Sequence, residues 1–159
     1  GKVSADLGAN VGGFTDCLLQ REAKCVYAVD TGYGVLAWKL RQDDRVVVLE
    51  RTNALHVSLP EPVDLVVIDA GWTQLGRIVP HAVSLLKEGG IIVALLKPQY
   101  EAFKEELERG VVLAACLDDV VNRVVQNLQT AGTQVVGPVP SQVPGSGGNR
   151  EFFILCEKG

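Results

Sequence analysis

Acidic and glycine residues near the start of the chain have the types and spacing of a binding site for a nucleoside cofactor. The run Asp6-Leu7-Gly8-Ala9-Asn10-Val11-Gly12-Gly13-Phe14-Thr15 reads as the end of a strand, a glycine-rich turn and the beginning of a helix. Glycine suits such a turn because it has no Cβ to keep a ligand from the backbone and because it adopts positive φ. The free N–H groups of the helix would face a carboxylate or phosphate. Asp30 ends the next apolar run, where its carboxylate can accept hydrogen bonds from ribose hydroxyls.

The spacing of these residues bears on the class of cofactor. Dinucleotide sites carry the pattern G-x-G-x-x-G, whereas this chain places Asp6, Gly8, Gly12 and Gly13 in the pattern D-x-G-x-x-x-G-G. That pattern is similar to the first motif of methyltransferases that use S-adenosylmethionine (SAM), in which a broader turn holds the methionine end of the cofactor. On this motif alone, a dinucleotide site and a tight turn without any ligand remain the alternatives.

The composition predicts one globular domain. The 159 residues are 47% hydrophobic and 21% charged, which is unlike a disordered chain. No apolar run approaches the ~20 residues that a membrane-spanning helix needs, so we expect no membrane interaction. The net charge of −4 disfavours independent binding to RNA, since RNA-binding surfaces rely on Lys and Arg contacts to phosphates. An RNA substrate would require a local basic patch or a further segment.

The cysteines indicate neither a disulfide framework nor a metal site. Cys17, Cys25, Cys116 and Cys156 show no C-x-x-C spacing and lie in apolar or helical patterns. We therefore expect buried free thiols in a reducing cytoplasm, and no bound metal.

Strand and helix patterns alternate along the chain. Near-continuous apolar runs predict strands at Val3–Leu7, 24–30, 45–50, 64–69 and 91–96, as in a parallel sheet that is covered on both faces. Helices are predicted at 12–21, 35–42, 75–87 (stopped by Gly89-Gly90) and 118–131. Segments 133–139 and 151–157 flank only the Pro/Gly/Ser-rich loop 140–149, so they should pair antiparallel. The pattern predicts an α/β fold in a single domain over residues 1–159: a Rossmann-like, mostly parallel central sheet with helices on both faces and an antiparallel C-terminal strand.

Polar residues lie at or just after the carboxyl ends of the predicted strands, at the edge of the sheet where ligands of such folds bind. They are Asp6, Asp30, Arg51-Thr52-Asn53, Asp69 and Lys97. Lys97 follows a buried strand and precedes Pro98, which restricts its backbone. A lysine in such a place indicates that its ammonium has a function in the site. The alternative is a lysine that only extends its charged end into solvent.

Longer motifs run through almost the entire chain. They are Gly12-Gly13-Phe14-Thr15-Asp16, Val26-Tyr27-Ala28-Val29-Asp30, Glu50-Arg51-Thr52-Asn53, Lys97-Pro98-Gln99-Tyr100-Glu101 and Gly148-Asn149-Arg150-Glu151-Phe152. With these motifs the chain resembles the methyltransferase core of the TlyA family, often labelled hemolysin-like and related to the FtsJ ribose methyltransferases. The resemblance implies SAM-dependent 2′-O-methylation of ribose in ribosomal RNA.

The resemblance also implies site residues. The related FtsJ enzymes use a Lys-Asp-Lys-Glu set, in which Asp69 matches the acid, Lys97 the second lysine and Glu151 the glutamate; the first lysine is expected upstream of this chain. Lys97 would orient the ribose hydroxyl and favour loss of its proton, while Asp69 and Glu151 would hold the lysine. Asp30 would bind the SAM ribose, and Asn53 the adenine edge. The full set of expected cofactor contacts is Asp6, Gly8, Ala9, Asn10, Gly12, Gly13, Phe14, Asp30, Thr52, Asn53 and Asp69.

Two segments differ from the family pattern and keep other functions open. Residues 70–74 read Ala-Gly-Trp-Thr-Gln where the family usually has Val-Ser-Phe-Ile-Ser, and residues 111–115 are apolar where the family continues toward Arg-Asp-Pro. The leading hypothesis is a cytoplasmic enzyme whose partner is ribosomal RNA or a ribosomal subunit, bound mostly through an N-terminal RNA-binding domain that this chain lacks. The alternatives are a SAM-binding module with altered or lost catalysis and, on the hemolysin label alone, a membrane-lytic protein, for which the chain has no strongly cationic amphipathic helix.

Overall fold

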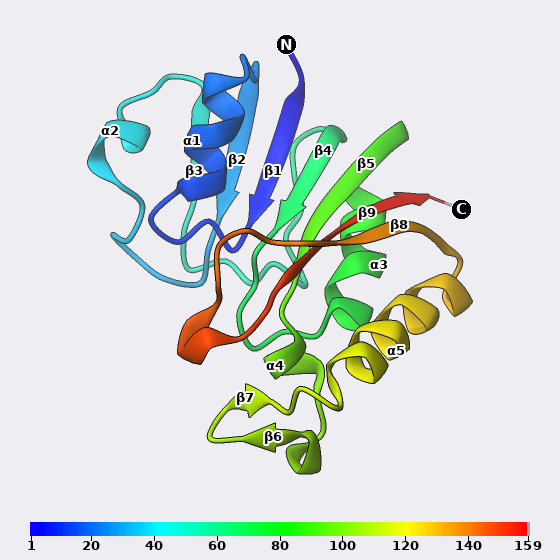
Figure 1. Ribbon diagram of the computed structural model, residues 1–159. Coiled ribbons are helices and arrows are strands. Elements are labelled where there is room, and N and C mark those ends of the chain that lie inside the picture. Colours follow the sequence, from blue (N-terminus) through cyan, green and yellow to red (C-terminus); the bar gives the residue numbers. More distant parts are fainter. Residues whose placement is uncertain (159) are drawn as a thin grey trace.

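Seven strands form one sheet in the computed structural model, which describes residues 1–158 (Figure 1). Five of them are parallel: β1 (Val3–Leu7), β2 (Cys25–Val29), β3 (Val46–Leu49), β4 (Val63–Ile68) and β5 (Leu86–Leu96). Their order in space is β3-β2-β1-β4-β5, so the winding reverses between β1 and β4. Ligands of open α/β sheets bind beyond the carboxyl ends of the strands at such a reversal.

Helices cover both faces of the parallel strands. They are α1 (Gly13–Gln20), α2 (Trp38–Arg41), α3 (Leu75–Leu85) and α5 (Leu117–Thr130). Tyr27 and Val29 of β2 belong to the same buried core as α3 and α5, whereas Val26 and Ala28 pack with α1 and α2. Successive side chains of a strand point to opposite faces, so these two cores lie on opposite sides of the sheet. The prediction of a mostly parallel sheet with helices on both faces is confirmed.

The last two strands complete the sheet in the opposite sense. β9 (Phe152–Lys158) is antiparallel to β5 on one side and to β8 (Thr133–Pro140) on the other. In this register Val93 of β5 lies opposite Leu155, which in turn lies opposite Val136 of β8. The predicted antiparallel pairing of the C-terminal segments is therefore confirmed.

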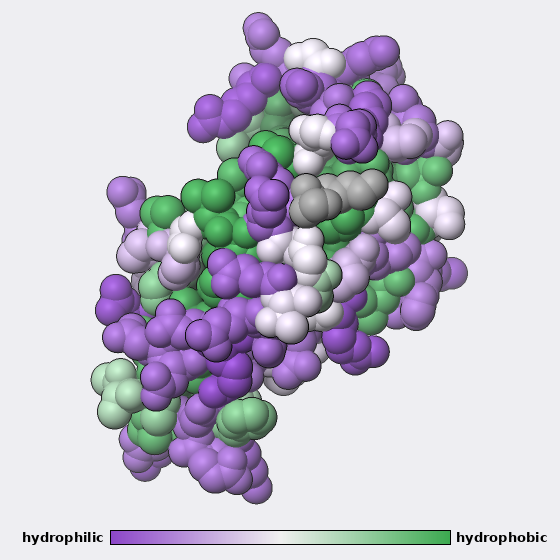
Figure 2. Space-filling model, turned by 90° about the vertical axis from the view of Figure 1, so that its right-hand side faces the viewer, coloured by the Kyte–Doolittle hydropathy of each residue, from purple (hydrophilic) through white to green (hydrophobic). Residues whose placement is uncertain are grey.

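The two faces of this half of the sheet are covered unequally. Ala94 and Ile154 are fully buried beneath α3 and α5, but their neighbours Leu95 and Phe153, which point to the other face, are only partly buried. Viewed from the β8 side, apolar surface shows between polar residues in the middle of the molecule (Figure 2). The start of α1 lies against this face, because the rings of Phe14 and Phe153 meet edge to face at 6.3 Å. An apolar floor is thus present beside the glycine turn.

The sequence predicted that Gly89-Gly90 stop a helix, and this was wrong: both glycines lie inside β5. Helix α3 ends at Leu85 and the strand begins at the next residue. Val63 of β4 pairs with Leu86, but Leu65 pairs with Ile91, so β5 carries extra residues in a bulge between these pairs. Glycine accommodates the irregular backbone of a bulge, which explains why the same dipeptide fits both interpretations.

Several short elements were not predicted from the sequence. These are the one-turn helix α4 (Pro98–Glu101) and the hairpin of β6 (Leu107–Glu108) and β7 (Val111–Val112). Two to four residues are too few to show a hydrophobic period. The helix predicted at 35–42 is also shorter: residues 35–37 form a loop, in which the Ala37 N–H donates to the Val11 carbonyl at 3.0 Å, and α2 begins at Trp38.

All four cysteines are free thiols, but only Cys156 is buried. Cys25 and Cys116 are partly exposed and Cys17 is exposed, so the expectation of buried thiols was wrong for three of them. No helix within residues 1–158 has the length and apolar character needed to cross a membrane.

Gly8 and Gly13 of the turn differ in a way that a pair of substitutions can test. A Cβ at Gly8, where φ is 88°, would overlap the backbone carbonyl of Asp69, whereas a Cβ at Gly13 would enter open space. Gly8→Ala should lower the free energy of unfolding by about 1–3 kcal/mol, the scale of a strained backbone. Gly13→Ala should leave it nearly unchanged. Urea unfolding of both variants makes the measurement, and equal stabilities would contradict the close approach.

Candidate active site

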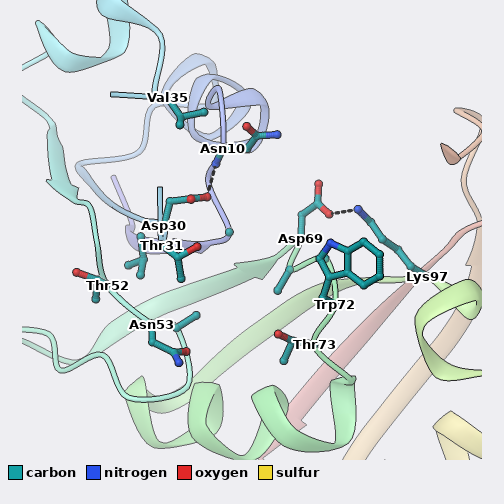
Figure 3. A pocket seen from close by; sticks show the side chains of 15 residues that line it. Asn10, Asp30, Thr31, Val35, Thr52, Asn53, Asp69, Trp72, Thr73 and Lys97 are labelled. Atoms are coloured by element: carbon teal, nitrogen blue, oxygen red, sulfur yellow. Dashed lines mark hydrogen bonds and ion pairs between the residues drawn. The ribbon is translucent and has the colours of Figure 1, made fainter. Parts of the chain in front are cut away.

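Three cavities meet at Asp69, beyond the carboxyl ends of the parallel strands. The Asp30 cavity, about 340 Å³, is lined by Asn10, Asp30, Val35, Asn53, Asp69 and Lys97, among others (Figure 3). The Gly13 cavity, about 380 Å³, lies over the turn and is lined by Gly8, Ala9, Asn10, Gly13, Phe14 and Asp69 among others. The Glu151 cavity, about 760 Å³, is lined by Phe14, Asp69, Lys97, Gln99, Tyr100 and Glu151 among others. Most of the residues that the sequence analysis selected are thus brought to one place.

Asp30 links the glycine turn to the loop after β2. One carboxylate oxygen accepts the Asn10 N–H at 2.9 Å and the other accepts the Gly32 N–H at 2.7 Å. Figure 3 shows the first of these bonds at one side of the Asp30 cavity. Each carboxylate oxygen can accept a further hydrogen bond. Asp30 is therefore placed rigidly, with acceptor capacity left for hydroxyl groups of a ligand.

Thr52 and Asn53 form another part of the wall of the Asp30 cavity. The Thr52 hydroxyl donates to the Glu50 carbonyl at 2.8 Å, and the Asn53 side-chain oxygen accepts the Leu55 N–H at 2.9 Å. The side-chain N–H groups of Asn53 have no partner within residues 1–158, so they are available to donate to a ligand. Of these two residues, only Asn53 offers the cavity a free donor.

Asp6 and Gly12 lie behind the turn and line none of the three cavities. The Asp6 side chain is fully buried and accepts a hydrogen bond from the Thr15 hydroxyl at 2.7 Å. Burial raises the pKa of Asp6 to about 6, although the bond from Thr15 opposes the shift. A Cβ at Gly12 would overlap the side chain of Leu40. The structure gives these two residues a place in the architecture of the turn, not in a cavity wall.

Lys97 and Asp69 form an ion pair at the boundary of the Asp30 and Glu151 cavities. The lysine Nζ lies 2.6 Å from a carboxylate oxygen of Asp69, and both side chains are about one-fifth to one-third exposed. The two residues follow neighbouring parallel strands, β4 and β5, whose ends lie side by side. Figure 3 shows the pair across the Asp30 cavity from Asp30. An oriented lysine amine thus faces both spaces.

Glu151 lies in the wall of the same cavity but does not hold the lysine. Its carboxylate accepts a hydrogen bond from the Gln99 side-chain nitrogen at 3.0 Å, and both side chains are buried. Of the two carboxylates expected to hold Lys97, only Asp69 does so. The reason lies in α4, which follows Lys97 directly and turns Gln99 onto Glu151, while the lysine reaches across to the neighbouring strand.

Trp72 is the residue in the site that the sequence analysis noted only as a departure from the family. Its side chain is 88% exposed, its φ is 65°, and its ring lies 5.0 Å from that of Tyr100. Positive φ in a bulky residue is strained and is retained mainly at functional sites. The signal available in the sequence was a large aromatic residue directly after Gly71 in a polar loop.

Glu101 anchors the same loop from its other end. Its carboxylate accepts the N–H of Leu75, the first residue of α3, at 2.7 Å. Burial raises the pKa of Glu101, while the bond from Leu75 opposes the rise. Consecutive side chains of α4 therefore contact three separate segments: Gln99 contacts Glu151, Tyr100 contacts Trp72, and Glu101 contacts the start of α3.

The sheet order and the glycine turn after β1 define a Rossmann-like α/β protein. The profile of the FtsJ-like methyltransferases matches residues 1–158. The chain therefore belongs to the FtsJ-like methyltransferase family. The resemblance inferred from the sequence motifs is confirmed by this match.

Individual relatives support the same assignment. The Mycobacterium tuberculosis protein named 16S/23S rRNA (cytidine-2'-O)-methyltransferase TlyA is 42% identical over 160 residues, covering 97% of this chain and 59% of that protein. YqxC of Bacillus subtilis, named as a candidate rRNA methyltransferase, is 41% identical over 162 residues, covering 96% of this chain and 57% of the relative. A solved structure from Streptococcus thermophilus, named as a candidate hemolysin, is 38% identical with a TM-score of 0.93, covering 99% of this chain and 59% of that one. The chain thus spans a little less than three fifths of the length of these relatives.

The buried carboxyl group of Asp6 predicts a specific dependence of stability on pH. Asp6 holds its proton up to about pH 6 in the folded state, against an ordinary pKa of 3.8. Its ionisation therefore lowers the free energy of unfolding as the pH rises from about 4 through 6, by up to roughly 3 kcal/mol. Asp6→Asn has no such ionisation, so its stability relative to wild type should increase over this range.

Thermal unfolding of both proteins at about pH 4, 6 and 8 tests this. The test is how the stability difference between Asp6→Asn and wild type changes with pH, because an effect of the amide that is the same at every pH cancels. A difference that stays the same at every pH would refute the assignment of a raised pKa to Asp6.

Proposed function

We propose that this chain is the SAM-binding and catalytic part of an enzyme that methylates the 2′-hydroxyl of a ribose in ribosomal RNA. The observation that carries the proposal is the Lys97–Asp69 ion pair at 2.6 Å, which borders the Asp30 and Glu151 cavities together. Membership of the FtsJ-like methyltransferase family and the names of two relatives as rRNA methyltransferases support it.

The residues around the Asp30 and Gly13 cavities fit SAM. Asp30 retains acceptor sites for the two ribose hydroxyls, Asn53 offers N–H donors to the adenine edge, and Val35 offers apolar contact. The absence of a side chain at Gly8 and Gly13 keeps the turn open toward the methionine end. When bound, SAM supplies an electrophilic methyl group on a positively charged sulfonium.

Lys97 and Asp69 fit the handling of a hydroxyl nucleophile. A ribose hydroxyl reacts poorly unless it is oriented and its proton is directed away. The Lys97 amine can take this role, because lysine protonation responds strongly to its surroundings. Asp69 holds the Lys97 side chain by the ion pair and so removes much of its freedom. Glu151, on the wall of the same cavity, offers an acceptor to the hydroxyl or its neighbour.

Trp72 supports RNA as the substrate. Its exposed ring lies on the wall of the Asp30 cavity and contacts Tyr100, which lines the Glu151 cavity. Bases of single-stranded RNA stack on such aromatic surfaces. The net charge of −4 indicates that most of the affinity for RNA comes from elsewhere, and the relatives are long enough to contain a further RNA-binding part. The cytoplasm, where bacterial ribosomes assemble, is the proposed compartment.

Asp30→Ala tests the cofactor site. The variant should bind SAM about 10- to 100-fold more weakly than wild type, the range expected when hydrogen bonds to a carboxylate are lost. Isothermal titration calorimetry measures the affinity, and thermal unfolding checks that the variant folds. Asp44→Ala is the matched control, since Asp44 is an exposed acid outside all three cavities. Equal affinity in the two variants would place the cofactor elsewhere.

Lys97→Met tests the catalytic site. In the full-length natural protein, with tritiated SAM and unmethylated ribosomal subunits as substrate, kcat should fall by about 10²- to 10⁴-fold, the contribution of general acid–base catalysis. The affinity for SAM should change little. Lys104→Met, at an exposed lysine outside the cavities, should behave like wild type. Transfer to a base, or undiminished transfer by Lys97→Met, would refute the proposed role.

A further inference from the structure

Gln99 is a buried amide in the wall of the Glu151 cavity that neither the family assignment nor the proposed chemistry uses. It is 9% exposed and belongs to α4, two residues after Lys97. Its side-chain nitrogen donates to a Glu151 carboxylate oxygen at 3.0 Å, and the two residues are 52 positions apart in the sequence. This contact therefore joins the end of β5 to the start of β9 inside the cavity.

The hydrogen bond fixes which way the amide points. A carboxylate can only accept, so the nitrogen of Gln99 must face Glu151 and the oxygen must face away. That oxygen is buried and has no partner within residues 1–158. A buried acceptor without a donor carries a free-energy cost, so the orientation is not the one that packing of Gln99 alone would favour. The orientation of the Gln99 amide is therefore set by its hydrogen bond to the Glu151 carboxylate.

The partner of Glu151 is neutral, and this decides what the carboxylate can do. Lys97, which lines the same cavity, is paired with Asp69. A direct bond to the lysine would neutralise Glu151 and occupy its lone pairs, whereas the amide leaves the negative charge and the remaining acceptor sites in the cavity. Gly145 packs over the same carboxylate so closely that a Cβ there would overlap it. Glu151 is thus confined from two sides.

We propose that Gln99 is a positioning residue, which holds the Glu151 carboxylate toward the substrate hydroxyl and keeps it apart from the Lys97–Asp69 pair. The inference rests on the proposed function and deepens it. On this proposal the site has two parts. The Lys97–Asp69 pair directs the proton of the hydroxyl away, and the Glu151 carboxylate, positioned by Gln99, orients the hydroxyl.

A double-mutant cycle with Gln99→Leu and Glu151→Gln tests this in the full-length protein. Leucine keeps the approximate size of the side chain and removes the donor. Gln99→Leu should lower kcat by about tenfold or more, because small displacements of a catalytic group have large effects on rate. The affinity for SAM and the KM for ribosomal subunits should stay within about twofold of wild type. In the Glu151→Gln background the same substitution should have little further effect, since residues that act as a unit are not additive.

Gln126→Leu is the matched control, because Gln126 is an exposed glutamine of α5 that lines none of the three cavities. It should retain wild-type kcat. A purely structural role for Gln99 would lower the melting temperature but leave the kcat per folded molecule unchanged. That result, or losses that multiply independently in the double variant, would overturn the inference while the proposed function stands. A wild-type protein that binds SAM and methylates no ribosomal RNA would instead refute the proposed function, and this inference with it.

Discussion

The close contact between the ends of β1 and β4 is the constraint on which the rest of the site depends. The Asp69 N–H donates to the Leu7 carbonyl at 3.0 Å, and Gly8 then passes so near the Asp69 carbonyl that no side chain fits between them. The glycine turn and Asp69 are therefore parts of one backbone junction. Because each is fixed relative to the other, the three cavities meet at Asp69, and a cofactor over the turn would lie beside the Lys97 amine.

The acids around this junction differ in their partners, and the partners assign them different tasks. Backbone N–H groups hold Asp30, the Lys97 ammonium holds Asp69, and the neutral amide of Gln99 holds Glu151. Backbone donors leave a rigid acceptor for hydroxyls, a cation gives an ion pair, and an amide leaves a charged acceptor in place. Under the proposed function, one type of side chain would therefore serve three roles because its surroundings differ.

The parts of the fold that could be predicted from the sequence are those that carry their own local signal. Each parallel strand is a continuous apolar run, and Asp30 and Lys97 stand directly at strand ends, so their place at one edge of the sheet followed from the topology. The bond between Gln99 and Glu151 could not be predicted, because it joins residues 52 positions apart through a helix of a single turn. The helix end predicted at Gly89-Gly90 was wrong for a related reason. Glycine is found both at helix ends and in bulges, and only the pairing of β5 with β4 distinguishes the two.

The loop between β4 and α3 is anchored at both of its ends, and this bears on which substrate the proposed site would accept. The first residue of the loop, Asp69, is held by Lys97. Leu75, the first residue of α3 after the loop, is held by the Glu101 carboxylate. The residues between these anchors contribute little to the buried core, and Trp72 is almost fully exposed. Substitutions here alter the surface offered to a nucleobase while both anchors stay in place. Under the proposed function, the difference from the family pattern at residues 70–74 therefore bears on substrate choice, while the Lys97–Asp69 pair on which the proposed chemistry depends stays in place.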